Sequence, residues 1–251
     1  MRYFLHLAYD GTRYAGWQVQ PNARTVQSEL DRCLSLVLRQ PVHVQGSGRT
    51  DAGVHASHQV AHFEAEVPAE LPLVQLLHRL RRVLPPDIAP LRLHPVAADA
   101  HARFSAEERS YEYFVLTEAN PFRRDFAVFM DHPLDVAAMN AAAAYLVGTH
   151  DFTTFSKVKG AETHYVCHCY EAGWHPAAGG LVFRIRANRF VRGMVRLVVG
   201  TLLDVGRGKR TPAEFQRLLE AQNRVEAGNA APARGLFLSR VEYGEGLVQR
   251  A

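Results

Sequence analysis

A glycine-punctuated loop carries the residues of this sequence that are best placed to do chemistry. It reads Gly46-Ser47-Gly48-Arg49-Thr50-Asp51-Ala52-Gly53 and sets the carboxylate of Asp51 two residues after the guanidinium of Arg49. Three glycines in eight residues permit positive φ angles and a close approach of the backbone to a ligand. The Gly-Lys-Ser/Thr ending of a phosphate-binding loop is missing, which argues against nucleotide hydrolysis. The competing interpretation is a tight surface turn in which Asp51 caps the local backbone.

Arg196 lies in an apolar run, Met194–Gly200, that is hydrophobic on almost every side of a helix. An unpaired guanidinium there would be strongly destabilising, so we expect a carboxylate partner, and Asp51 is the candidate. Such a pair would keep Asp51 ionised, as a nucleophile or base requires. Alternatively, the Arg196 stem packs while its charged head reaches water.

Two tyrosines, Tyr111 and Tyr113, share one face of a predicted strand that follows His101-Ala102-Arg103-Phe104-Ser105. An exposed tyrosine beside arginines is suited to stacking on an unpaired base, whereas a half-buried strand position is the structural alternative.

The cluster Cys167-His168-Cys169, with His164 and His175 nearby, is the place to look for a metal site. Zinc sites usually combine Cys-x2-Cys or His-x3-His units in loops, whereas a strand here would put both thiols on one face and His168 on the other. We therefore expect buried thiols, no metal and no cofactor. The sequence also has no nucleophile elbow of a serine hydrolase.

Helix and strand patterns alternate along the chain to position these groups. In the first half, strands are predicted at 2–9, 42–46, 57–65 and 88–96, and helices between Thr25 and Pro41 and over about 71–83. In the second half, strands are predicted at 110–117, 164–175, 181–188 and 235–243, and helices from Asp135 to Gly148, over 190–204 and from Thr211. The order indicates an α+β protein of two β-α-β-β-α-β halves, 1–104 and 105–251, with mixed, largely antiparallel sheets that flank a central cleft.

Composition and charge narrow the function classes. The chain has 251 residues and no apolar run approaching the roughly 18 needed to span a membrane, so we expect a soluble cytoplasmic protein. The sequence pI is about 9.1. Between Arg184 and Arg210 there are eight Lys or Arg residues and one acid, Asp204. Clustered positive charge is typical of a phosphate-rich partner, although it can also be a solvated basic face.

At this point the sequence closely resembles the tRNA pseudouridine synthase A family. Gly48-Arg49-Thr50-Asp51-Ala52-Gly53-Val54-His55 is similar to the signature loop of that family. Other blocks follow in family order: Tyr9-Asp10-Gly11-Thr12, Gly16-Trp17-Gln18, Thr25-Val26-Gln27, Phe63, His101-Ala102-Arg103-Phe104-Ser105-Ala106, Tyr111-Glu112-Tyr113, Asp151-Phe152-Thr153, Asn188–Arg196 and Gly235-Leu236-Phe237-Leu238.

The resemblance implies a pseudouridine synthase fold and a role for each matching residue. Asp51 would be the catalytic aspartate, Tyr111 the tyrosine that packs against the target base, and Arg196 the arginine paired with the aspartate. The implied RNA-binding residues are Arg49, Ala100, His101, Ala102, Arg103, Phe104, Arg189 and Arg192. The chain departs from the family pattern at Arg189, where glycine or alanine is common, and at Gly193, which replaces a bulkier residue.

The implied activity is isomerisation of uridine to pseudouridine at tRNA positions 38, 39 and 40 in the anticodon arm, by a homodimer without a cofactor. Two alternatives remain: a catalytically silent tRNA-binding protein on the same fold, and a nucleoside glycosidase that uses the same aspartate and releases free uracil.

Overall fold

The chain forms two compact units. The computed structural model describes residues 1–157, 164–244 and 247. Met1–Glu107 together with Leu238–Ala251 form the first unit, and Glu108–Phe237 form the second unit. Within the described ranges, no helix is long and apolar enough to cross a membrane.

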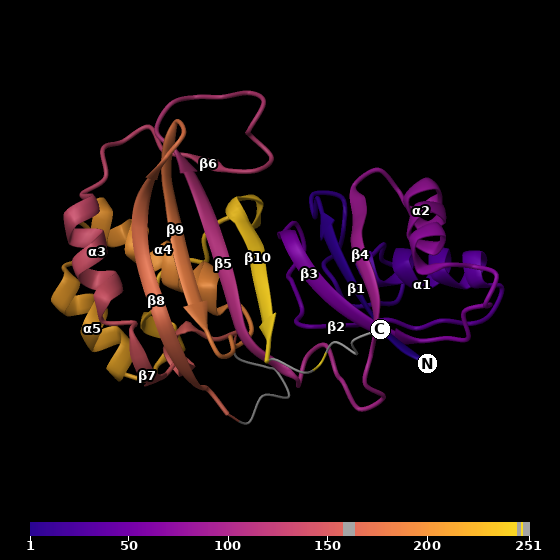
Figure 1. Ribbon diagram of the computed structural model, residues 1–251. Helices are drawn as coiled ribbons and strands as arrows, with labels where there is room; N and C mark the ends of the chain where they lie inside the picture. The colour runs from indigo at the N-terminus through magenta and orange to yellow at the C-terminus, as the bar shows by residue number, and fades with distance from the viewer. Residues whose placement is uncertain (158–163, 245–246, 248–251) are drawn as a thin grey trace. The chain divides into compact units, whose positions relative to one another are not determined.

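The first unit is a sheet with two helices on one face (Figure 1). Its elements are β1 (Arg2–Tyr9), α1 (Val26–Leu38), β2 (Gln45–Gly46), β3 (His55–Glu64), α2 (Leu73–Val83), β4 (Ile88–Val96) and β10 (Leu236–Tyr243), which belongs to this unit from Leu238 onward. The strand order is β4-β1-β3-β10, and β2 pairs with β3. Strand β1 is antiparallel to both β3 and β4.

Alternation along β1 separates the two faces of this sheet. Tyr3, Leu5 and Leu7 are buried on one face, and Phe4 and His6 point to the other. Helix α1 begins at a capping box, in which the Thr25 side chain accepts a hydrogen bond from the Ser28 amide.

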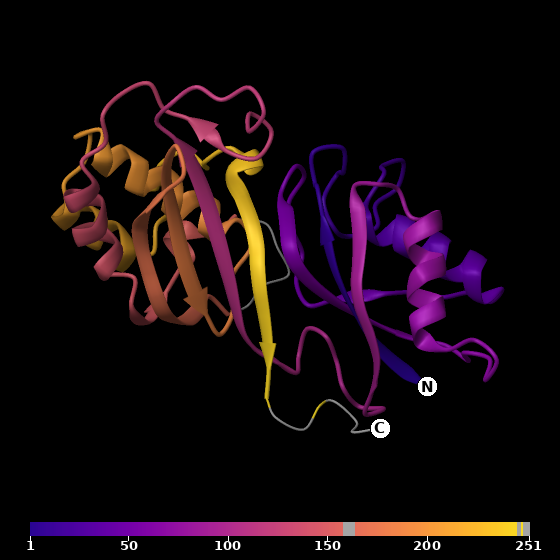
Figure 2. The same cartoon turned by 45° about the horizontal axis from the view of Figure 1, so that its top comes forward.

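The main strands of the second unit follow the order β5-β9-β8-β7. Its elements are β5 (Ala106–Leu116), β6 (Val128–Phe129), α3 (Val136–Ala144), β7 (Gly148–Asp151), η1 (Thr153–Phe155), β8 (Val166–Ala177), β9 (Gly180–Ala187), α4 (Met194–Gly206), α5 (Pro212–Glu220), η2 (Arg224–Glu226) and η3 (Ala233–Gly235). Neighbouring strands are antiparallel, except that β6 is parallel to β5. Helix α3 packs on β8 and contacts α4 and α5, and Figure 2 shows α3 and α5 side by side.

The predicted α+β class and largely antiparallel pairing are confirmed. The start of α4 and the end of α3 differ from the predictions for local reasons. Helix α4 begins at Met194, not 190, because Gly193 caps it with a φ of 77°. Helix α3 ends at Ala144, and Gly148, with a φ of 111°, instead opens the unpredicted strand β7.

The strand predicted at 42–46 is only two residues long. The amide of Val42 donates to the Ser35 hydroxyl, and the amide of Val44 donates to the Asp31 carboxylate. These side chains of α1 take the hydrogen bonds that a neighbouring strand would otherwise supply.

Candidate active site

The loop 47–54 runs from β2 into β3 and is tied to β3 at its start. The Ser47 amide donates to the Val60 carbonyl over 2.8 Å, and Gln59 Nε2 donates to the Gly48 carbonyl over 3.1 Å. The loop therefore leaves the sheet in a fixed direction.

A second segment, 10–17, holds the residue that precedes Asp51. The Trp17 amide donates to the Thr50 carbonyl over 3.1 Å, and the Thr50 hydroxyl lies 2.8 Å from the Tyr9 hydroxyl. Thr50 is fixed through both its main chain and its side chain. Because Asp51 is the next residue, its backbone is held in place by these two hydrogen bonds of Thr50.

Two glycines outside the loop let these segments meet. A Cβ on Gly16 would lie 2.5 Å from the Thr50 carbonyl oxygen, and a Cβ on Gly11 would lie 2.0 Å from the Val54 carbonyl oxygen. Gly16 also has a φ of 98°, which side chains rarely adopt. Both positions require glycine for the approach of backbone to backbone.

The three glycines of the motif 46–53 differ in their surroundings and in their backbone angles. Gly53 has a φ of 74° and lies in a turn in which the Val54 amide donates to the Asp51 carbonyl over 3.1 Å. A Cβ on Gly46 would lie 2.5 Å from the indole of Trp17, whereas a Cβ on Gly48 would meet nothing within 4 Å. Positive φ, expected for the loop glycines in general, is thus found at Gly53 alone among these three.

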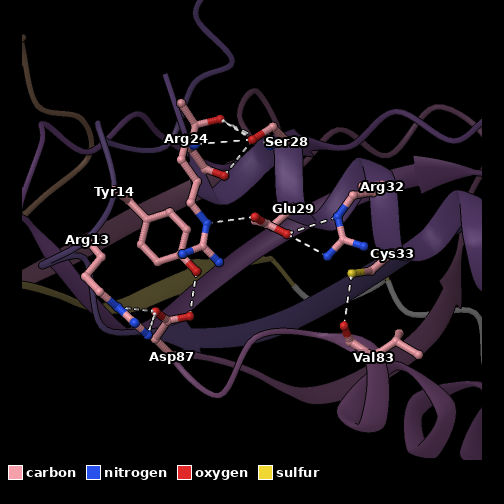
Figure 3. A network of polar contacts seen from close by, with 10 residues as sticks. Arg13, Tyr14, Arg24, Ser28, Glu29, Arg32, Cys33, Val83 and Asp87 are labelled. Carbon is pink, nitrogen blue, oxygen red and sulfur yellow. Dashed lines mark hydrogen bonds and ion pairs between the residues drawn. The ribbon is translucent and has the colours of Figure 1, made fainter. Parts of the chain in front are cut away.

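Asp87, the residue before β4, holds two side chains of the segment 10–17 (Figure 3). Its carboxylate accepts hydrogen bonds from the Tyr14 hydroxyl at 2.5 Å and from the Arg13 guanidinium at 2.6 Å. Burial alone would raise the pKa of Asp87, but these two donors lower it below its ordinary value. The Tyr14 carbonyl in turn accepts from the Gly53 amide over 3.3 Å, so this network reaches the loop.

His55, the residue at the end of the loop motif, is fully buried and has a structural role. Its Nδ1 accepts a hydrogen bond from the Gly11 amide over 3.0 Å. Asp10 Oδ1 lies 3.1 Å from the same nitrogen. His55 thus joins the end of the loop to Asp10 and Gly11 at the start of the segment 10–17.

Asp51 is half-buried and Arg49 is exposed on the loop. The first unit therefore presents a carboxylate and a guanidinium from one rigid turn. The ion pair predicted between Asp51 and Arg196 would join the first unit to the second, and it stays a prediction.

The segment 100–104 follows β4 in the first unit. The side chains of Ala100 and Ala102 are buried, with 1% and 0% exposure, and Ala102 is fixed by its amide, which donates to His62 Nδ1 over 3.1 Å. His101 is half-buried, whereas Arg103 and Phe104 are exposed. Of the predicted RNA-binding side chains in this segment, those of His101, Arg103 and Phe104 are accessible to a ligand.

A pocket of about 540 Å³ brings this segment together with the loop. Its lining includes Arg49, His101, Arg103 and Phe104, which the sequence singles out, and also Trp17. The other lining residues are Gln18, Val19, Gln27, Asp31, His43, Val44, Gln45, Gly46 and Gly48. The Gly16-Trp17-Gln18 and Thr25-Val26-Gln27 blocks are sequence signals that could have pointed to this pocket.

Tyr111 and Tyr113 lie on β5 in the second unit and are both buried. Tyr111 is 8% exposed, and its ring contacts the ring of Phe190 edge to face at 5.0 Å. Tyr113 is fully buried, its hydroxyl donates to the Pro232 carbonyl over 3.0 Å, and burial raises its pKa. Tyr113 is thus a core residue, and Tyr111 is the tyrosine with a small exposed part.

Arg196 is half-buried on the first turn of α4. Its Nε donates to the Ala231 carbonyl over 2.7 Å, and the Ala231 amide donates to the Arg196 carbonyl over 2.8 Å. A Cβ on Gly200 would lie 1.9 Å from the Asn229 carbonyl oxygen, so the segment 229–231 packs tightly along the helix. The main chain of Ala231 therefore fixes both the backbone of Arg196 and the orientation of its guanidinium.

Part of the positive charge between Arg184 and Arg210 is neutralised within the second unit. Arg184 Nε lies 3.0 Å from a carboxylate oxygen of Glu112, and Arg186 Nη1 lies 2.6 Å from one of Glu108. These are cross-strand pairs between β9 and β5, and they reduce the local charge available to a partner.

Arg189 and Arg192 lie between β9 and α4, where Arg189 is half-buried and Arg192 is exposed. Asn188 fixes the start of this connection, since its Oδ1 accepts from the His168 amide over 2.9 Å and its carbonyl accepts from Arg109 over 3.0 Å. This connection is therefore held at its beginning by side chains of β5 and by β8.

The Cys167-His168-Cys169 cluster lies on β8 with both thiols buried and free. Burial raises the pKa of Cys169 to about 12, and its Sγ contacts the Glu171 carbonyl. Among the described residues, no group of three His, Cys, Asp or Glu side chains is arranged to hold a metal ion.

Comparisons with known proteins agree with the resemblance seen in the sequence. A sequence model described as tRNA pseudouridine synthase matches residues 6–105 and 142–244. A Bacteroides thetaiotaomicron protein named tRNA pseudouridine synthase A is 49% identical over 97% of this chain and 91% of its own length. Proteins of the same name from Parabacteroides distasonis (46% identical, 98% and 97% covered) and Bacillus subtilis (43% identical, 97% and 99% covered) are also similar.

Proposed function

The chain belongs to the tRNA pseudouridine synthase family, and from this premise we propose that it isomerises uridine to pseudouridine in tRNA, with Asp51 as the catalytic carboxylate. The observation that carries the proposal is the rigid loop that presents Asp51 beside Arg49. The reaction breaks the bond from uracil N1 to the ribose C1′, rotates the base and joins C5 to C1′. The product is an isomer of the substrate, so the reaction needs no redox partner and no group donor.

A carboxylate can open this reaction in three ways. Asp51 could attack C1′, add to C6 of the base, or remove the 2′ proton to give a glycal. Each route needs an ionised carboxylate, and an ion pair with Arg196 would favour that form. The reciprocal contacts between Arg196 and Ala231 support this role, because they orient the guanidinium without help from the substrate.

The target base must leave the RNA stack before Asp51 can reach its ribose, at a cost of a few kcal/mol. In our proposal Arg49 helps to draw the nucleotide out, and Tyr111 packs against the extruded base. The position of Tyr111 supports this role, since its edge-to-face contact with Phe190 holds a nearly buried ring at a fixed angle.

The finer assignments follow the family resemblance. We propose that the substrate uridines are those at positions 38, 39 and 40 of the anticodon arm, and that the enzyme acts in the cytoplasm as a homodimer. His101, Arg103 and Phe104 of the first unit, and Arg189 and Arg192 of the second, would contact the RNA. Ala100 and Ala102 would contribute through their main chain, because their side chains are buried.

The test compares wild-type protein with Asp51→Asn on unmodified tRNA transcript, with pseudouridine mapped chemically at each position. Product in the anticodon arm is expected from the wild type alone. Asp131→Asn is the matched control, because the side chain of Asp131 is 69% exposed and lies outside the proposed site. Equal product from wild type and Asp51→Asn would remove Asp51 from its role. RNA binding without product would favour the silent binding protein, and free uracil would favour the glycosidase.

A further inference from the structure

The pocket beside Arg49 lies wholly within the first unit and has the size of a small-molecule site. Its volume of about 540 Å³ falls in the range of roughly 300–1,000 Å³ that is typical of ligand pockets. Three separate segments form it, 17–19, 43–49 and 101–104, together with Gln27 and Asp31 of α1. A pocket built from several ordered segments is pre-formed, so a ligand would find it without rearrangement.

The exposed part of its lining combines an aromatic ring with positive charge. Phe104 is 76% exposed, an unfavourable setting for a large apolar side chain. Its ring lies 4.4 Å from the ring of His101, and the guanidinium of Arg103 lies 5.6 Å from the Phe104 ring centre. Arg49 is a second exposed cation on the lining. Aromatic platforms flanked by arginines are the general means by which proteins hold unpaired nucleotides.

Other residues of the lining offer hydrogen-bonding groups. Gln45 Oε1 lies 3.1 Å from His101 Nε2, and Asp31 accepts from the Val44 amide over 2.8 Å. The Asp31 carboxylate on the lining repels phosphate, whereas the edge of a base can donate a hydrogen bond to it. The charge pattern thus favours a base directed inward and a phosphate held outside, by Arg49 and Arg103.

The occupant differs from the uridine that is isomerised. Asp51 is absent from the described residues that line the pocket, although Gly48 and Arg49 are among them. A nucleotide whose C1′ is at Asp51 is therefore not the one that fills this pocket. Resting on the function proposed above, we propose that this pocket binds one unpaired nucleotide that neighbours the target in the RNA chain, with its base stacked on Phe104.

The test uses anticodon stem-loop RNAs in which 2-aminopurine replaces one unpaired loop residue at a time. Each RNA is titrated with the Asp51→Asn protein, which prevents turnover. Strong quenching of the fluorescence is expected at one position next to the target. Adding Phe104→Ala should abolish that quenching and raise Kd about 5- to 150-fold, the loss expected for one stacked base, whereas Phe104→Trp should retain it.

Phe122→Ala is the matched control, since Phe122 is 90% exposed and lies outside the pocket. It should change neither the quenching nor Kd. Equal quenching with and without the Phe104 ring, or equal quenching at every loop position, would overturn the proposal. Mapping of pseudouridine by the wild type is measured in parallel. Product without the position-specific quenching refutes this pocket alone, whereas absence of product refutes the proposed function.

Discussion

Asp51 is positioned by the residues on either side of it in the loop. Thr50 is held by Trp17 and Tyr9, and the turn that follows Asp51 closes onto Val54. A carboxylate fixed in this way does not have to be ordered when the substrate arrives, which preserves binding energy for the reaction itself.

Substitution by alanine should lower the stability of the protein at Gly16 but not at Gly48. Gly16→Ala would place a Cβ 2.5 Å from the Thr50 carbonyl at a φ of 98°, so we expect a loss of about 1–3 kcal/mol of stability and a lower kcat. Gly48→Ala meets nothing within 4 Å and should leave the Tm within about 2 °C of wild type. Thermal unfolding and turnover of both variants would check this, and an unchanged Gly16→Ala would contradict it.

Sequence patterns predict contacts between residues close together in the chain, but not contacts between strands. The helix predicted from Thr211 is confirmed, and it begins at a capping box of Thr211 and Glu214, whose partners lie within one turn of the chain. The ion pairs of Arg184 and Arg186 were not predicted, since they depend on the register between β9 and β5. Local chemistry is readable from spacing, whereas cross-strand chemistry requires the alignment of segments about 75 residues apart.

Helix α4 is the element on which the proposed pairing of Asp51 depends, because it carries Arg196. Its register along the segment 229–231 is fixed by Gly200, whose missing side chain lets the Asn229 carbonyl approach. The helix and this segment therefore form one structural piece, although the chain passes through α5 and η2 between them.

Gly200→Ala should be destabilising, against the usual effect of this substitution in a helix. Alanine ordinarily stabilises a helix interior by about 1 kcal/mol relative to glycine. Here its Cβ would lie 1.9 Å from a carbonyl oxygen, so we expect the free energy of unfolding to fall by about 1–3 kcal/mol. Denaturant unfolding measures the sign directly, and a gain in stability would show that the segment 229–231 does not pack against α4.

The helices and long strands were predicted within a few residues, and the short elements were not. Strands β6 and β7 are two and four residues long, too short to show alternation. In the segment predicted as a strand at 42–46, two backbone amides bond to side chains of α1 and not to a neighbouring strand. The pattern of apolar residues does not reveal such contacts. The pocket was missed for a similar reason, because its walls come from segments that are separated in the sequence and meet only in the folded unit.

For the first unit as a whole, the sheet face that carries Phe4 also carries a chain of histidines. The Val241 amide donates to His58 Nδ1, so the proton of neutral His58 lies on Nε2 and is donated to His6 Nδ1 over 2.9 Å. His6 then carries its own proton on Nε2, which has no hydrogen-bond partner in the described part of the chain. His94 lies beside it, with ring centres 5.1 Å apart.

This face should make stability depend on pH. Burial, with smaller effects from neighbouring charges, lowers the pKa of His6 to about 3 and that of His62 to about 4. As the pH falls below about 6.5, these histidines become protonated in the unfolded chain while they stay neutral in the folded unit. Stability is therefore complete above pH 6.5 and is lost progressively as the pH falls, down to about pH 4 for His62 and about pH 3 for His6. The loss that His62 alone causes at pH 5 is about 1–2 kcal/mol.

Thermal unfolding between pH 7.5 and pH 5 tests this expectation. His62→Gln keeps an acceptor for the Ala102 amide and should make the fall in Tm with acid shallower. His43→Gln is the control, because the His43 side chain is 84% exposed. Identical slopes for wild type and His62→Gln would show that His62 is not held neutral by the fold.

The return of the chain at β10 has a consequence for biosynthesis. Strand β10 neighbours β3 and belongs to the first unit from Leu238 onward, but the whole of 108–237 is translated before it. On the ribosome, the part of this edge of β3 that β2 does not pair therefore stays open while the second unit is made. An open edge is a template for pairing with another nascent chain, so this interval of translation is when the protein most needs protection from misassembly.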